Sequence, residues 1–122
     1  MAALKQLKLD DSTIVFFSSD NGPQPGAWKD IFVDFFDGAA GRRGAKGSFY
    51  EGGIRVPLIA RWPGRIKAGS VSDHIGYFPD VMPTLAELAG ATAALPPTDG
   101  LSLVPTLLGR PGQKSHEHLY WE

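Results

Sequence analysis

The chain has 122 residues, of which 43% are hydrophobic and 20% are charged, so it has the composition of one globular domain and not of a disordered chain. Its formal net charge of −1 gives it neither the basic footprint of a nucleic-acid-binding protein nor that of a membrane-surface protein, and no apolar run is long enough to cross a membrane. The sequence contains no cysteine, which excludes disulfides and thiolate zinc sites within it.

The first elements predicted along the chain are a helix and a buried strand. Residues 2–9 predict the last turns of an amphipathic helix, because Ala3, Leu4 and Leu7 share one face. A polar turn at residues 10–12 leads into the apolar run at residues 14–17, which is typical of a strand buried on both faces. A helix, a short turn and a buried strand in this order indicate an α/β fold.

A carboxylate and a carboxamide follow this strand. Asp20 and Asn21 stand where the strand ends, and Gly22 and Pro23 predict a turn after them. In open α/β sheets, ligands bind at the carboxyl ends of strands, and side-chain oxygens suit a hard cation such as calcium or magnesium. The same residues are also ordinary turn formers, so on this stretch alone a metal site and a structural turn remain alternatives.

A long connection with little regular pattern runs from residue 23 to residue 53, and connections of this length tend to be functional. Its first part offers aromatic and aliphatic side chains that we expect to anchor it to the body of the protein: Trp28, Ile31, Phe32, Phe35 and Phe36. Its second part places Arg42, Arg43 and Lys46 among glycines, so that the backbone could approach an anion beside a positive charge. A Walker A spacing is absent, and a solvated basic loop is the alternative for the two arginines.

The second half of the chain predicts one strand and one main helix. Residues 54–62 form the strand region, and Pro57 suits its start better than its centre. Residues 79–90 form the helix, with Asp80 as its N-cap and Gly90 as its C-terminal cap. The helical spacing of three apolar residues predicts the face that packs on the core: Val81, Leu85 and Leu88.

The last elements predicted are a short helix at residues 101–108 and the beginning of a strand at residues 119–121. The chain thus opens on a helix without a cap and closes on a strand that has only begun. We therefore expect a segment of a larger α/β domain.

Five motifs in a fixed order resemble a known family. They are Ser-Asp-Asn-Gly after the strand, Gly-Ala-Lys-Gly-Ser-Phe-Tyr-Glu-Gly-Gly-Ile-Arg-Val-Pro, Ala-Arg-Trp-Pro-Gly, Pro-Asp-Val-Met-Pro-Thr-Leu-Ala-Glu-Leu-Ala-Gly and Asp-Gly-Leu-Ser-Leu. This order is similar to that of the type I, formylglycine-dependent sulfatases, over residues 4–122. The resemblance implies an alkaline-phosphatase-like fold, in which a mostly parallel or mixed sheet lies in a three-layer α/β/α domain.

The resemblance also implies roles for individual residues. Asp20 and Asn21 match metal ligands that hold calcium, or sometimes magnesium, and Lys46 matches the catalytic lysine that contacts the sulfate of a sulfate-ester substrate. These roles are coherent physically, because a divalent cation and a fixed ammonium stabilise the negative charge that develops on the sulfate oxygens. The resemblance also suggests that the protein is located in the periplasm, outside the cell or in the lysosome.

The sequence departs from the family pattern in one essential respect. No Cys or Ser lies in the C/S-x-P-x-R motif that yields the formylglycine nucleophile, so that group is not encoded in this segment. We therefore expect residues 1–122 to be a partial sulfatase catalytic domain, without the N-terminal half that holds the nucleophile and without the C-terminal subdomain. Such a segment is expected to be inactive alone, to bind calcium weakly and to self-associate through its uncovered faces.

Other side chains receive supporting roles. Glu51 and Arg55 are expected to pair and brace the lysine loop, and His74 to be a structural hydrogen-bonding residue near the site. His116 and His118 fit a solvated edge better than a metal site. Three further aromatic side chains are predicted to lie in the core and not to form a substrate platform: Trp62, Phe78 and Trp121.

Two other functions remain open at this point. A phosphonate or phosphodiester hydrolase of the same superfamily would use the same cation and tetrahedral-anion chemistry, with a threonine in place of the formylglycine precursor. A non-catalytic remnant would keep only the scaffold.

Overall fold

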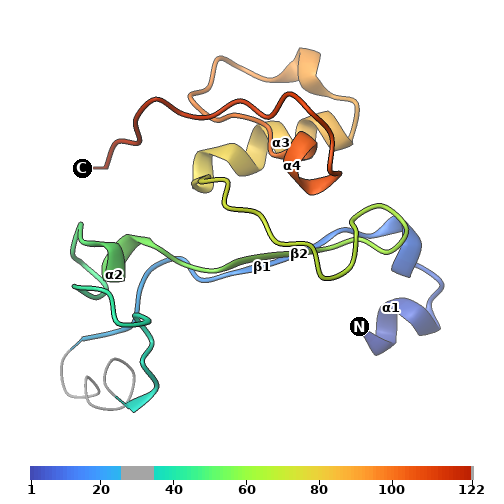
Figure 1. Cartoon of the computed structure of the whole chain (residues 1–122). Helices are drawn as coiled ribbons and strands as arrows, with labels where there is room; N and C mark the ends of the chain where they lie inside the picture. Colours follow the sequence, from blue (N-terminus) through green and yellow to red (C-terminus); the bar gives the residue numbers. More distant parts are fainter. Residues whose placement is uncertain (26–34, 122) are drawn as a thin grey trace. The chain divides into compact units, whose positions relative to one another are not determined.

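The structure, a computed structural model, describes residues 1–25 and 35–121. Figure 1 shows its helices and strands, which in chain order are α1 (Ala2–Gln6), the 3-10 helix η1 (Asp10–Ser12), β1 (Val15–Ser18), α2 (Glu51–Ile54), β2 (Leu58–Arg61), η3 (Phe78–Asp80), α3 (Val81–Leu88), η4 (Thr92–Ala94) and α4 (Val104–Leu107). They form two compact units, Val15–Ala60 and Met1–Ile14 with Arg61–Glu122. Helices beside a small sheet agree with the predicted α/β class. Among the described residues, none of the helices has the length and hydropathy needed to span a membrane.

Helix α1 is shorter than predicted. It ends at Gln6, because Lys8 adopts a left-handed conformation with φ of 57°. The amide of Lys8 then bonds the carbonyl of Lys5 at 3.1 Å, and the amide of Leu9 bonds that of Leu4 at 2.9 Å. This is the hydrogen-bond pattern of a Schellman motif, which ends the helix.

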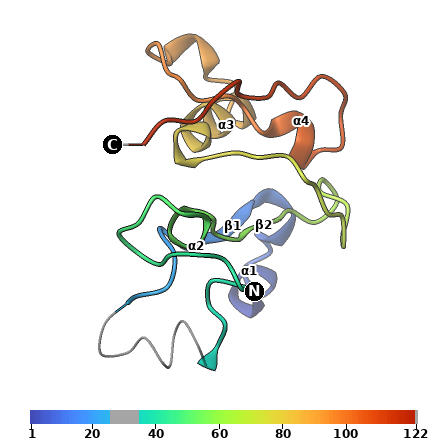
Figure 2. The same ribbon diagram turned by 60° about the vertical axis from the view of Figure 1, so that its left-hand side comes forward.

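Strands β1 and β2 pair in a two-stranded sheet and lie side by side in both views (Figures 1 and 2). Strand β2 begins directly after Pro57, as the missing amide of proline requires. The expectation that β1 is buried on both faces is wrong for this chain, because Phe17 is 65% exposed and its neighbours in β1 are half-buried. Within the described residues, no third strand extends the sheet.

The long connection also differs from its prediction. Phe35 and Phe36 are 78% and 64% exposed and so do not anchor it, while Trp28, Ile31 and Phe32 lie outside the described residues. Helix α2 was not predicted, because its four residues include two glycines and are too short to show a period. The predicted strand at residues 119–121 does not form among the residues described.

Helix α3 ends as predicted but is buried differently. Gly90 has φ of 68°, and the bonds from its own amide to Glu87 and from Ala91 to Ala86 complete a Schellman motif. The predicted core face is wrong for Val81 and Leu85, which are 39% and 43% exposed, whereas Leu88 is half-buried. Pro83 and Thr84 are buried instead. Apolar spacing showed which side chains share a face, but the described chain covers that face only in part. Phe78 and Trp121 are exposed for the same reason, at 55% and 42%, and only Trp62 of the three predicted core aromatics is half-buried.

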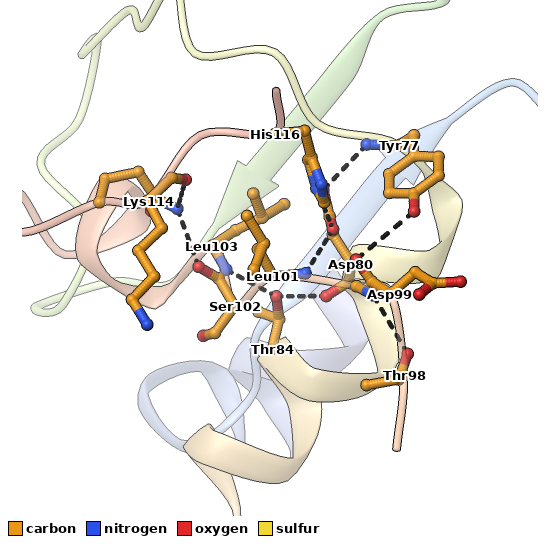
Figure 3. A network of polar contacts seen from close by, with 12 residues as sticks. Tyr77, Asp80, Thr84, Thr98, Asp99, Leu101, Ser102, Leu103, Lys114 and His116 are labelled. Atoms are coloured by element: carbon orange, nitrogen blue, oxygen red, sulfur yellow. Dashed lines mark hydrogen bonds and ion pairs between the residues drawn. The ribbon is translucent and has the colours of Figure 1, made fainter. Parts of the chain in front are cut away.

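A buried polar network joins α3 to the segment that follows it (Figure 3). Asp80 is 0% exposed, and its carboxylate accepts hydrogen bonds from the amides of Tyr77 at 3.0 Å and Leu101 at 2.7 Å. Asp80 occupies the N-cap position of α3, as predicted, but its side chain makes no capping bond to that helix and instead ties the residues before α3 to those before α4. The hydroxyl of Thr84 extends the network, donating to the carbonyl of Asp80 at 2.6 Å and accepting from the amide of Leu103 at 2.9 Å.

His116 belongs to the same network. Its Nε2 lies 2.8 Å from Oδ1 of Asp80, its side chain is 11% exposed, and its ring meets that of Tyr77 edge-on at 4.8 Å. The prediction of a solvated edge is therefore wrong for His116, whereas His118 is exposed. Burial raises the pKa of the Tyr77 hydroxyl, and the charges of Asp99 and Asp80 raise it further.

An ion pair secures the start of the chain. The guanidinium of Arg61 donates to both carboxylate oxygens of Asp10, at 2.7 and 2.8 Å, and the indole of Trp62 donates to the carbonyl of Asp11 at 2.8 Å. The hydrogen bond from Arg61 lowers the pKa of Asp10. Residues 10 and 11 are thus attached to the end of β2, some fifty residues away in sequence.

Candidate functional site

The candidate site begins at the turn that follows β1. The hydroxyl of Ser19 donates to the backbone carbonyl of Asn21 at 2.8 Å, and the side-chain amide nitrogen of Asn21 donates to the carbonyl of Gly22 at 3.1 Å. The Asn21 nitrogen is thereby engaged with the backbone, which leaves its side-chain oxygen as the group available to a ligand. Asp20 is exposed, and within residues 1–25 and 35–121 no ion pair occupies its carboxylate.

Two backbone hydrogen bonds connect this turn to the lysine loop. The amide of Gly22 donates to the carbonyl of Gly53 at 2.8 Å, and the amide of Lys46 donates to the carbonyl of Pro23 at 2.9 Å. The turn that carries Asp20 and Asn21 and the loop that carries Lys46 are therefore fixed to one another through main-chain atoms. The sequence predicted both segments but not this connection.

Glycines make the close approach possible. A Cβ at Gly22 would overlap the carbonyl oxygen of Gly52, and one at Gly52 would overlap that of Gly44. Backbone meets backbone here with no room for a side chain, which is the use of glycine at such points. These glycines were missed as site residues, although their number around Lys46 was the signal that could have found them.

Lys46 itself lies in a tight turn. The amide of Ser48 bonds the carbonyl of Ala45 at 3.0 Å, and Gly47 takes the positive φ of 86° that the third position of a type II turn requires. The hydroxyl of Ser48 also accepts from the amide of Ala45 at 3.2 Å and donates to its carbonyl at 2.9 Å. Lys46 is exposed at the tip of this turn, and among the described residues its ammonium has no ion-pair partner.

The two arginines before the turn differ from one another. The guanidinium of Arg43 lies 3.7 Å from the centre of the Tyr50 ring, and its carbonyl accepts the amide of Gly52 at 2.8 Å. The guanidinium of Arg42 donates a long bond, 3.4 Å, to the carbonyl of Ala39, which also accepts the backbone amide of Arg42 at 3.1 Å. A freely solvated loop therefore does not describe Arg43.

The pairing of Glu51 with Arg55 forms as predicted. The two charged groups lie 3.1 Å apart across one turn of α2, with side chains 59% and 63% exposed. An exposed pair of this kind contributes about 0–1 kcal/mol. Its role in bracing the lysine loop remains a prediction.

His74 lies in the other compact unit. Its Nε2 is buried and has no hydrogen-bond partner among the described residues, so the expected structural hydrogen bond does not form at that atom. With His116 and His118 it lines a hollow of about 370 Å³, which brings the three histidines of the chain to one place. Its role in the candidate site remains a prediction.

The donor set of the site suits a hard cation but is incomplete. Asp20 and Asn21 offer a carboxylate and an amide oxygen, which are the ligands that calcium and magnesium prefer. Calcium takes six to eight oxygens. No group of three or more His, Cys, Asp or Glu residues able to hold a metal occurs in the described part of the chain.

Comparison with known proteins gives one consistent result. The family model described as "Sulfatase" matches residues 1–91. The chain is 36% identical to the N-acetylgalactosamine-6-sulfatase of Canis lupus familiaris and 38% identical to human arylsulfatase A, in each case over 99% of this chain and 22% of the relative. A crystal structure of a sulfatase from Pseudoalteromonas sp. superposes with a TM-score of 0.76 at 33% identity, covering 94% of this chain and 22% of that one. The chain thus spans about a fifth of the length of the relatives it matches.

Proposed function

This chain belongs to the sulfatase family, with the alkaline-phosphatase-like fold of its structural relatives, and from that premise we propose that the whole protein hydrolyses sulfate esters to an alcohol and inorganic sulfate. The observation that carries the proposal is the pair of hydrogen bonds that fixes the Asp20–Asn21 turn to the Lys46 turn. Two oxygen-bearing side chains that could hold a cation, and an ammonium without an ion pair among the described residues, on one backbone framework suit the tetrahedral, negatively charged sulfate group of an ester. Residues 1–122 would then be part of the catalytic domain, with the formylglycine supplied by another part of the protein.

The residues present define how the site would act. Lys46 is exposed and has no ion-pair partner among the described residues, so its ammonium can bind the sulfuryl oxygens and stabilise the charge that grows on them in the transition state. The rigid turn means that little reorganisation accompanies binding. Lysine suits a tetrahedral anion because its ammonium is a compact point charge.

Membership of the sulfatase family implies a metal cofactor. We propose calcium, with magnesium as the alternative, held in part by Asp20 and Asn21. The cation would supply Lewis-acid stabilisation of the sulfate oxygens. The bond from the Asn21 side-chain nitrogen to the Gly22 carbonyl fixes the plane of the amide, and with it the direction of the amide oxygen that would bind the cation.

The proposal is tested by Lys46→Ala in the catalytically complete protein. Loss of a preorganised charge-stabilising donor costs about 10²–10³-fold in turnover, so aryl-sulfate hydrolysis should fall by that factor. The melting temperature should stay unchanged, because the Lys46 ammonium makes no contact with the described residues that folding depends on. Lys67→Ala, a lysine of the other unit, is the matched control. Turnover equal to that of the parent in Lys46→Ala would refute the role, and preferential cleavage of a phosphodiester would favour the phosphohydrolase alternative.

The metal assignment predicts weak binding by these 122 residues alone. Two ligand residues with a single carboxylate leave most of the calcium coordination to water, so we expect a dissociation constant on the order of millimolar or weaker. No sulfate should be released from an aryl sulfate, because the nucleophile is not encoded here. Isothermal titration with calcium measures the first expectation, and a dissociation constant in the micromolar range would contradict it. Self-association through the exposed faces of β1 and α3 remains part of the proposal.

A further inference from the structure

We propose that Arg43 is a positioning residue for Lys46, acting through the ring of Tyr50; the proposal rests on the function given above. Arg43 and Tyr50 stand at the two ends of the segment that carries Lys46. The guanidinium of the first lies over the ring of the second, 3.7 Å from its centre. The contact therefore closes the base of the lysine loop.

Among the described residues, one backbone bond outside the loop holds its tip, from the amide of Lys46 to the carbonyl of Pro23 at 2.9 Å, so the closure at the base adds to this single attachment. Gly44 and Gly47 both take positive φ angles, of 92° and 86°, and a Cβ at Gly47 would find no atom within 4 Å. The tip of the loop is therefore open, with glycines whose backbone freedom must be lost when the loop is ordered. Ser48 orders the turn internally, but it does not connect the turn to the rest of the unit.

The base of the loop is connected to the metal-binding turn through neighbouring backbone bonds. The amide of Gly52 donates to the carbonyl of Arg43 at 2.8 Å, and the amide of Gly53 donates to that of Tyr50 at 2.7 Å. The carbonyl of Gly53 in turn accepts the amide of Gly22, next to Asn21. Arg43 and Tyr50 thus form the side-chain part of a structure whose backbone part reaches the Asp20–Asn21 turn.

The residue types suit this task. A guanidinium is planar and weakly hydrated, so it stacks on an aromatic face more closely than an ammonium does. The contact is partly exposed, since the Tyr50 residue is 48% accessible, and its own contribution to folding is correspondingly small. A small displacement of a charged group from its productive position, in contrast, can cost on the order of 100-fold in rate. Loss of the contact should therefore reduce turnover more than stability.

The experiment compares four variants in the catalytically complete protein with an aryl sulfate as substrate. Arg43→Met and Tyr50→Leu should each lower kcat about 10-fold with little change in KM or in the melting temperature. Tyr50→Phe keeps the ring and should restore most of the turnover. Arg65→Met is the matched control, because Arg65 lies over the ring of Trp62 at 5.4 Å in the other unit, and it should leave kcat unchanged.

A double-mutant cycle with Lys46→Ala identifies the residue through which Arg43 acts. If Arg43 positions Lys46, Arg43→Met should cost nothing further once Lys46 has been removed. Additive losses would overturn the positioning role while leaving the proposed function intact. Full turnover in Lys46→Ala alone would overturn both. If Arg43→Met does not fold, Tyr50→Leu against Tyr50→Phe makes the same comparison, and equal turnover in that pair would refute the proposal.

Discussion

Replacing Thr84 by valine should destabilise the protein by removing one buried hydrogen-bond acceptor. Thr84 is 1% exposed, and its hydroxyl accepts the amide of Leu103 at 2.9 Å (Figure 3). Valine has almost the same shape, but it can neither accept that bond nor donate the one that the hydroxyl makes to the carbonyl of Asp80 at 2.6 Å. Leu103 is itself only 7% exposed, so water cannot readily replace the lost partner of its amide.

The size of the effect follows from two opposing terms. A buried amide left without a partner costs about 1–3 kcal/mol, while the added methyl group returns about 0.8 kcal/mol at most. The net loss in the free energy of unfolding is therefore about 1 kcal/mol at the middle of that range and about 2 kcal/mol at its upper end. For a chain of this size that corresponds to a melting temperature lower by roughly 4–10 °C.

Thermal unfolding followed by circular dichroism measures this loss, and amide hydrogen exchange at Leu103 should become faster. Thr98→Val is the matched control, because the Thr98 hydroxyl also accepts a backbone amide, that of Gly100 at 3.1 Å, but in an exposed position where water can substitute. That variant should change stability by less than about 0.5 kcal/mol. Equal melting temperatures for the parent and Thr84→Val would show that the buried bond does not stabilise the fold.

Local chemistry explains most of what the sequence could predict. Gly90 was expected to end a helix and does so with φ of 68°, because only a residue without a Cβ takes that angle readily. Pro57 was expected near a strand start and immediately precedes β2. Asp20, Asn21 and Lys46 were predicted as site residues from their motifs, and the structure joins their two turns through main-chain bonds, while their roles remain predictions.

Burial could not be predicted in the same way, because it depends on partners that are distant in sequence. The spacing of Val81 and Leu85 correctly groups them on one face, yet that face is exposed in this chain. Asp80 and Thr84 are buried instead, since their partners lie about twenty or more residues away along the chain. The spacing of residues along the chain carries no information about such partners. His116 was assigned to a solvated edge for the same reason, because its partner Asp80 lies far from it in sequence.

Two further predictions concern contacts that the sequence did not reveal. The bond from Arg61 lowers the pKa of Asp10 below its ordinary 3.8, so the ion pair stabilises the fold above that pH and its contribution is lost as the pH falls through the folded-state pKa. Asp10→Asn should therefore unfold at lower urea concentration than the parent near pH 7, and the difference between the two midpoints should close below about pH 4; a constant difference would contradict this linkage. Gly52→Ala addresses the site, because its new methyl group would overlap the carbonyl oxygen of Gly44. Backbone on both sides cannot rotate away, so the segment before the lysine turn must shift, at a cost of about 1–3 kcal/mol in stability. The shift moves the lysine relative to the Asp20–Asn21 turn, and turnover should fall on the order of 100-fold, more than the loss of folded protein can account for. Denaturation midpoints measured beside kcat separate the two effects, and a variant that loses stability while keeping the kcat of the parent would show that the close backbone approach does not position the lysine.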